Sequence, residues 1–366
     1  MTYVIIGMIC FIVFVIFRTF VTKEMNIGAL AISGIGFIIA SSIIVYVDYK
    51  SQTDDVEVWS GKIVSVKHTE EYDEFIPPRT ETYTETDSKG KTVTKTRVIA
   101  GYWEHHYATN YIETTDKGLI KVRKVPDGRR LDDDFVNSTE ELEEFYPVGS
   151  PTASIHTYEN KLKASYSIFK HKDIDLEEYS GLPEYPSEVT SRYSVNRLIG
   201  NFKDSDKLNL HLDNINTKLN DTNNPNNKEK VKSYKQVNLM FVNLGNKPED
   251  YGWALQDHWK NGAKNDFVVT FGTDKNGKIT WGHPFSWTDV EILKTDVREY
   301  MIGKNVKDFK PVIDGVADLV EKKFDRKQFA EFDYIQIDIS PSGRNLIFVA
   351  VAIACIAYYL LDKENF

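Results

Sequence analysis

Four histidines of this sequence have side chains that could bind a metal ion. His105 and His106 directly follow Glu104, while His68 and His156 lie in segments where apolar and polar residues alternate. Imidazole and carboxylate groups are common zinc ligands, so these residues define a candidate zinc site. Adjacent residues of a strand point to opposite faces, so only one of the two neighbouring histidines can reach a given metal ion. Separate structural roles for the histidines are the simpler interpretation.

Other chemistry-bearing residue types give weaker signals. The sequence contains no P-loop, no Rossmann glycine pattern, no nucleophile elbow and no HExxH motif. Cys10 and Cys355, the two cysteines, lie in apolar runs, so the polar segment between them has neither a disulfide nor a thiolate metal site. Four tryptophans predict either an aromatic ligand platform or, more simply, core packing: Trp253, Trp259, Trp281 and Trp287.

Three apolar runs predict an integral membrane protein. We expect two transmembrane helices within residues 1–50, at about residues 3–21 and 27–47, and a third at residues 344–361. A helix needs about 20 apolar residues to cross a hydrocarbon core of about 30 Å. The first run does not resemble a cleavable signal peptide, because no basic region precedes it and no A-x-A site follows it.

Small residues form a stripe along the second predicted span, which suits close packing against a neighbouring helix: Ala29, Ser33, Gly36 and Ala40. Small residues are also common in membrane helices generally, so the stripe need not mark an interface. A homo-oligomer formed through the transmembrane helices is a further prediction.

The charges around the spans predict an orientation. Arg18 and Lys23 lie between the first two spans, whereas the segment after the second span opens with several acidic residues. The positive-inside rule therefore places the short loop in the cytoplasm and the large polar segment outside. The predicted location is the cytoplasmic membrane of a bacterium or bacterial host, with the lipid bilayer and another membrane or envelope protein as partners. The net charge of -9 and the absence of a Lys/Arg-rich stripe exclude duplex nucleic acid as a partner.

The first part of the polar segment, residues 51–175, predicts a β-rich module. Alternating apolar and polar residues predict strands in three stretches: Val56–Lys67, Tyr107–Glu113 and Leu119–Val125. Thr80–Thr96 predicts a long solvated hairpin around a turn at Ser88-Lys89-Gly90. Prolines within residues 176–200 predict a linker to the next domain.

The second part, residues 201–338, alternates predicted helices and strands. Val237–Val242 and Phe267–Phe271 are continuous apolar runs that predict buried strands. Thr288 and Glu291 predict a capping box for a following helix, and a last helix carries apolar residues at helical spacing. Strand, crossover helix and strand predict an α/β sandwich whose first two strands are parallel. The expected fold class is thus an α+β membrane protein.

The run from Val237 to Asn243 and the helix with Tyr251 and Trp259 resemble the TPM domain, as do Gly262–Gly272 and Phe285–Asp289. The resemblance covers residues 195–335 and implies a TPM-like α/β sandwich. This family includes thylakoid-lumen proteins of photosystem repair, bacterial envelope proteins and a receptor-modulating protein of animals. The whole chain also resembles three-span membrane proteins of unknown function from tailed bacteriophages and bacteria. In some of those, a cysteine-rich insertion lies near the position of Pro77–His106, where this sequence has no cysteine.

The TPM resemblance implies a candidate metal site. Some members of the family are acid phosphatases or bind divalent cations through acidic residues near the strand ends. The matching positions here are Asp266 and, more loosely, Asp257 and Asp289. Carboxylates suit hard cations such as Ca²⁺. The alternative is structural: Asp266 caps a turn, Asp257 lies solvated on a helix, and Asp289 serves a helix N-terminus.

The function predicted from these observations is that of a membrane-anchored, non-catalytic interaction protein that assembles with or modulates another membrane complex. One alternative is a divalent-metal-dependent phosphatase, which requires carboxylates clustered in one cleft. Another is a cytoplasm-facing membrane regulator, should the orientation be inverted. The interaction function instead requires an exposed apolar or aromatic patch.

Overall fold

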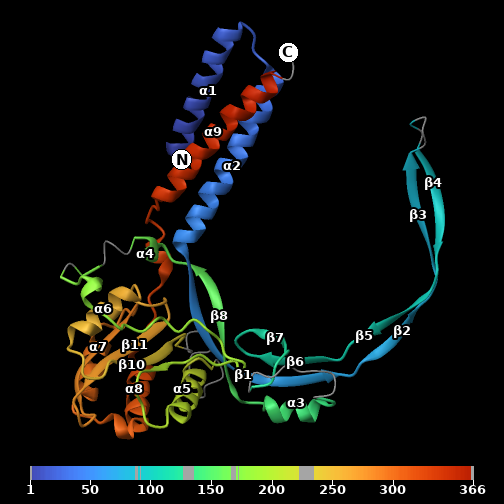
Figure 1. The fold of residues 1–366 in the computed structure, drawn as a ribbon. Coiled ribbons are helices and arrows are strands. Elements are labelled where there is room, and N and C mark those ends of the chain that lie inside the picture. The colour runs from blue at the N-terminus through green and yellow to red at the C-terminus, as the bar shows by residue number, and fades with distance from the viewer. Residues whose placement is uncertain are drawn as a thin grey trace. The chain divides into compact units, whose positions relative to one another are not determined.

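The computed structural model describes most of the chain, which divides into two compact units. Unit 1 contains residues 1–56, 157–174 and 328–366, and unit 2 contains residues 57–156 and 175–327. Figure 1 shows the helices and strands of both units. The described residues are 2–86, 90, 92–126, 136–165, 170–171, 173–221 and 235–363.

Unit 1 is built on three long apolar helices: α1 (Thr2–Thr22), α2 (Ile27–Thr53) and α9 (Pro341–Lys363). Each is long and apolar enough to cross a membrane, which confirms that long apolar helices form at the three predicted spans. The short helix α4 (Lys161–Ala164) and the 3-10 turn η4 (Phe329–Phe332) also belong to this unit.

The three long helices share an apolar core. Phe11 of α1 and Tyr358 of α9 meet edge to face, with 6.4 Å between their ring centroids. Gly7 allows the close approach, because a Cβ atom at this position would lie 2.8 Å from both Phe37 and Val351. The helices therefore form one packed bundle.

The buried line of α2 differs from the predicted small-residue stripe. Ala29 and Ser33 are buried, but Gly36 is exposed, and the line continues through Phe37 and Ser41. Ala29, Ser33, Phe37 and Ser41 follow one another at intervals of four residues, so their side chains lie one above the other along the helix. The buried members of the stripe pack within this bundle.

Arg18 corrects one assumption behind the predicted orientation, because it lies in α1 and not in the loop. Its Nε atom is 3.1 Å from Oδ2 of Asp362 in α9, whose side chain is only 2% exposed. The guanidinium also lies over the ring of Tyr359. The apolar residues that follow Arg18 extend the helix, and Asp362 neutralises its charge within the bundle.

A four-stranded sheet, whose strands lie mostly in unit 2, has the order β7-β6-β1-β8. Its strands are β1 (Asp54–Thr69), β6 (Thr109–Thr114), β7 (Gly118–Lys121) and β8 (Pro151–Glu159). One face packs on helix α3 (Thr139–Phe145) through Ile63, Ile112 and Leu142. Strands β6 and β7 are antiparallel, with Glu113 opposite Leu119.

A two-stranded ribbon is inserted between β1 and β6. Its base pairs β2 (Tyr72–Ile76) with β5 (Tyr102–His106), and its arm pairs β3 (Arg79–Thr86) with β4 (Thr92–Ile99). Figure 1 shows the two pairs following one another along one extended ribbon. This is the predicted solvated hairpin. Its Ser88-Lys89 turn lies outside the described residues.

A second four-stranded sheet forms the core of the other half of unit 2, in the order β12-β11-β10-β9. The strands are β9 (Leu198–Ile199), β10 (Asn238–Asn243), β11 (Asp266–Thr273) and β12 (Ile279–Ser286). Strands β10 and β11 are parallel, as predicted, with Phe241 opposite Val269. Residues 176–200, predicted as a linker, supply β9 and the 3-10 turn η2 (Leu176–Glu178).

Helices cover both faces of this sheet. Side chains of α5 (Ser205–Leu219), α7 (Ile292–Met301) and α8 (Lys310–Lys323) pack with Leu239 and Phe267 on one face. Helix α6 (Asp250–His258) packs with Met240 and Val268 on the other. Both faces are buried, which explains why β10 and β11 are continuously apolar. The 3-10 turn η3 (Val306–Asp308) precedes α8.

The start of α7 corrects the predicted capping box. Thr288 accepts a hydrogen bond from the Val290 backbone N–H and donates one to the Asp325 carbonyl oxygen. The residue before α7 is Glu291, whose side chain binds Lys294 and caps no backbone group. Thr288 therefore connects the segment before α7 to Asp325, which follows α8. The three-residue spacing of Thr288 and Glu291 suggested a reciprocal cap that the two side chains do not form.

Candidate functional site

Asp266, the main predicted metal ligand, is a fully buried hydrogen-bond acceptor at the start of β11. Its Oδ1 accepts a hydrogen bond from Asn238 Nδ2 at 2.9 Å. Its Oδ2 accepts hydrogen bonds from Tyr185 Oη at 2.8 Å and from the Ala263 N–H at 2.7 Å. These donors hold a tight turn that includes Gly262, whose φ of 74° favours glycine.

The other two predicted ligands lie in different surroundings. Asp257 is buried on α6. Asp289 is exposed, and its Oδ1 lies 2.9 Å from Lys327 Nζ. Among the residues that the structure describes, no group of three or more His, Cys, Asp or Glu side chains could hold a metal ion. The three aspartates are therefore not assembled into a shared site.

Substitution of Asp266 by Asn separates the structural role from a metal-binding role. We expect Asp266→Asn to lower the free energy of unfolding by about 2–3 kcal/mol, because the amide nitrogen of asparagine cannot accept the buried hydrogen bonds that one carboxyl oxygen of Asp266 accepts. Added Ca²⁺ should change the melting temperature of neither protein. A Ca²⁺-dependent rise in the wild type that disappears in a variant of unchanged basal stability would support the metal site instead.

The histidines occupy separate environments. His68 contacts Asn110 Oδ1 at 2.8 Å, and His156 stacks on Trp59. On the ribbon base, His105 contacts Asp73 at 2.8 Å, whereas His106 contacts Glu74 at 3.1 Å. The neighbouring histidines thus have different acidic partners, as alternation along a strand requires.

The tryptophans contribute mainly to the core. Trp259 and Trp281 are buried, and their indole N–H groups donate hydrogen bonds to backbone carbonyl oxygens of Pro183 and Lys247. Trp253 is more exposed, and its ring centroid lies 3.9 Å from that of His283. A buried aromatic side chain with its polar atom satisfied stabilises a fold, so this set does not form one ligand platform.

Arg197 joins the two halves of unit 2 and is only 1% exposed. Its guanidinium donates to Asn238 Oδ1 at 2.7 Å, to Asp213 Oδ1 and to Ser60 Oγ at 2.8 Å. Burial raises the pKa of Asp213, and the positive charge of Arg197 opposes that rise. The group therefore links β1 to α5 and β10.

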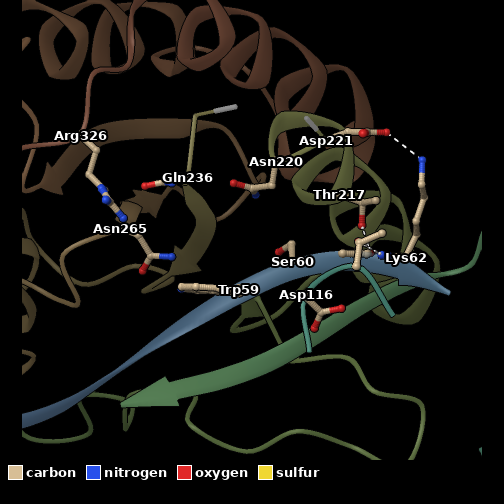
Figure 2. Close-up of a pocket in the computed structure, with 12 residues that line it drawn as sticks. Trp59, Ser60, Lys62, Asp116, Thr217, Asn220, Asp221, Gln236, Asn265 and Arg326 are labelled. Atoms are coloured by element: carbon tan, nitrogen blue, oxygen red, sulfur yellow. Dashed lines mark hydrogen bonds and ion pairs between the residues drawn. The ribbon is translucent and has the colours of Figure 1, made fainter. Parts of the chain in front are cut away.

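A polar cavity of about 180 Å³ lies beside this junction, within unit 2 (Figure 2). Trp59 provides an aromatic wall, and its ring stacks on His156 at 3.9 Å. Lys62 and Asp221 form an ion pair of 2.8 Å at the cavity, and Thr217 donates a hydrogen bond to the Gly61 carbonyl oxygen. Amide and cationic side chains complete the lining: Asn220, Gln236, Asn265 and Arg326. The chemistry of this lining suits a small polar molecule with one flat face.

The ribbon base carries a group of exposed aromatic side chains. Trp103 of β5 and Tyr107 just after it are each 69% exposed. Phe75 packs on Trp103 with 5.3 Å between ring centroids, and Tyr72 stacks on His106 at 4.5 Å. Large apolar groups on both faces of a thin ribbon have no core to enter.

Comparison with protein-family models, curated proteins and solved structures gives no match. The TPM resemblance therefore rests on the residues that carry it.

Sequence reasoning missed the two features that the structure makes most prominent. Arg197 is a single charge in a segment without periodic pattern, so nothing in the sequence marks it as buried. The aromatic residues of the ribbon could have been noticed in the sequence: Tyr72, Phe75, Tyr102 and Trp103 lie in two short runs that are otherwise rich in charged residues. Large aromatic side chains are unusual in strands that are exposed to solvent and have no binding role.

Proposed function

We propose that this chain is a membrane-anchored, non-catalytic interaction protein that assembles with or modulates another membrane protein through its ribbon. The observation that carries the proposal is the exposed aromatic side chains of the ribbon base: Tyr72, Phe75, Tyr102, Trp103 and Tyr107. Exposed apolar patches on folded domains mark binding sites, and aromatic residues are enriched in protein interfaces.

The alternative of a metal-dependent phosphatase has less support from the described residues. Such an enzyme needs carboxylates gathered around a metal or a positioned nucleophile. Asp266 instead accepts hydrogen bonds from neutral donors, and Asp289 contacts Lys327. We propose that the α/β half is a TPM-like domain in which the turn at Gly262 has a structural role.

The proposed orientation places unit 2 outside the cytoplasm of a bacterium or bacterial host. Lys23 follows α1, and Lys363 at the end of α9 adds a positive charge to the same end of the bundle, as the contact between Arg18 and Asp362 shows. Basic residues favour the cytoplasmic side. A membrane-impermeant maleimide should therefore label Thr84→Cys in intact cells. Labelling only after lysis would support the cytoplasm-facing alternative.

A photo-crosslinking experiment tests the interaction function. We expect a benzophenone amino acid at Trp103 in the full-length chain to give protein adducts in cells, because this position is exposed on the ribbon base. The same group at Leu210, which is 54% exposed on α5, serves as the control. Exposed substitutions of this kind usually change stability by less than about 0.5 kcal/mol. Equal adduct formation at the two positions would contradict the proposal.

A further inference from the structure

The ribbon arm, β3 with β4, is an incomplete sheet. Its strands pair over eight positions, from Arg79 opposite Ile99 to Thr86 opposite Thr92. In the described part of the chain, neither strand pairs with a third one. Nearly every side chain of the arm is exposed. A two-stranded ribbon without a buried face is only marginally stable in water, and its open edges are templates for another strand.

The two faces of the arm differ in chemistry. One face carries seven threonines and a valine: Thr80, Thr82, Thr84, Thr86, Thr92, Thr94, Thr96 and Val98. The other carries charged pairs, of which Glu81 contacts Arg97 at 2.7 Å and Glu85 contacts Lys95 at 2.5 Å. Arg79 lies on the charged face and forms no ion pair within the described residues.

The outer edge of β3 is complementary to itself. In an antiparallel pairing of two copies about a two-fold axis at Thr82, Arg79 of each copy lies opposite Glu85 of the other. Thr80 then faces Thr84, so the threonine face continues across both copies, and Glu81 faces Tyr83. Opposite charges directly across a pair of strands stabilise it by about 0.2–1 kcal/mol.

Several other symmetric registers bring like charges together. Centring the pairing of β3 on Tyr83 places Glu81 opposite Glu85, and centring it on Glu81 places that residue opposite its own copy. On β4, an axis at Lys95 opposes two lysines, and an axis at Thr96 opposes Lys95 to Arg97. Cations on an edge strand protect it from pairing. β4 carries no acidic side chain, so none of its symmetric registers gives an ion pair between the copies. On β3, pairing about Thr80 overlaps only residues 79–81, and pairing about Thr84 places no charge opposite another within the described residues. The register at Thr82 is therefore the one that combines a long overlap with two ion pairs.

We propose that the partner of the ribbon arm is a second copy of this chain, bound by antiparallel pairing of β3 with β3 about Thr82. The two arms then form one four-stranded sheet in the order β4-β3-β3-β4. This pairing is isologous, so it closes as a dimer and does not propagate into a fibre. The inference deepens the proposed interaction function by naming the occupant of the β3 edge, and it rests on that function.

Cysteine crosslinking of the full-length protein in detergent tests the register. In a background with Cys10 and Cys355 replaced by Ala, Thr82→Cys should form a disulfide-linked dimer under mild oxidation. Residues opposite each other in antiparallel strands have Cα atoms about 4.5–5.5 Å apart, within the range of about 4.4–6.8 Å that disulfides accept. The matched control is Thr96→Cys, which lies opposite Thr82 on β4 and should remain monomeric.

Charge exchange tests the contact itself. Glu85→Arg places two arginines opposite each other at both ends of the pairing, so the yield of the Thr82→Cys dimer should fall about tenfold. Adding Arg79→Glu restores opposite charges and should restore the dimer. A monomeric Thr82→Cys protein, equal crosslinking at Thr96→Cys or no recovery after the charge exchange would overturn the self-pairing. Adducts of the Trp103 probe with a different protein, without a Thr82→Cys dimer, would overturn self-pairing and leave the interaction function standing.

Discussion

Replacing Arg197 with Met should lower the free energy of unfolding of unit 2 by about 3–5 kcal/mol, because it leaves a buried charge without its partner. Arg197 is 1% exposed and its guanidinium neutralises Asp213, which is also buried. Methionine fills much of the same volume but donates no hydrogen bond to Asp213, Asn238 or Ser60. Thermal unfolding and limited proteolysis of the full-length protein in detergent measure the loss.

Arg298 supplies the matched control. Its guanidinium contacts Glu249 at 3.0 Å, but its side chain is 48% exposed. Exposed ion pairs contribute about 0–1 kcal/mol, so Arg298→Met should have a small effect. Equal destabilisation by the two substitutions would contradict the structural role of Arg197.

The Arg197 effect should also depend on pH in a defined direction. Burial raises the pKa of Asp213, and Arg197 lowers it. Without Arg197 the pKa of this carboxyl rises further, and a carboxyl with a raised pKa binds more protons in the folded state than in the unfolded state. Stability of the variant then falls as pH rises through that pKa. The deficit relative to the wild type should therefore be smaller at pH 5 than at pH 8, and a deficit equal at both pH values would contradict this account.

The sequence predicted the elements whose residues repeat with a clear period. β10 and β11 are continuously apolar because helices cover both faces of their sheet, and α8 carries apolar residues at helical spacing. β9 escaped prediction because two residues, Leu198 and Ile199, are too few to show a period. Arg197 escaped with it, since its partners are brought from other parts of the chain by tertiary folding.

The limits of periodicity also explain why the ribbon surface was underestimated. Thr80–Thr96 correctly predicted a solvated hairpin, because its residues offer little to bury. The pairing that places all its threonines on one face depends on register, which the described pairs fix and the composition does not. The exposure of the aromatic residues of the base follows from the pairing of their strands, which leaves no core for these side chains to enter.

The second large loss of stability is expected in α8. Two aliphatic residues of similar size in this helix differ in burial. Ile313 is fully buried against the α/β sheet, whereas Leu319 is only partly buried at the edge of the same cluster. Truncating a buried isoleucine to alanine costs about 2–5 kcal/mol, through lost transfer energy and the cavity left behind. Ile313→Ala should therefore make unit 2 sensitive to protease at temperatures where the wild type resists.

Leu319→Ala is the matched variant and should lower the free energy of unfolding by less than half as much, because water already reaches part of its side chain. Helix propensity contributes little to the comparison, since ordinary residues differ from alanine by at most about 0.7 kcal/mol in a helix. Membrane insertion should be unchanged in both, because α1, α2 and α9 carry the spans. Equal losses at the two positions would mean that α8 buries its Leu319 face as deeply as its Ile313 face, and the packing of this helix on β10 and β11 would then be wrong.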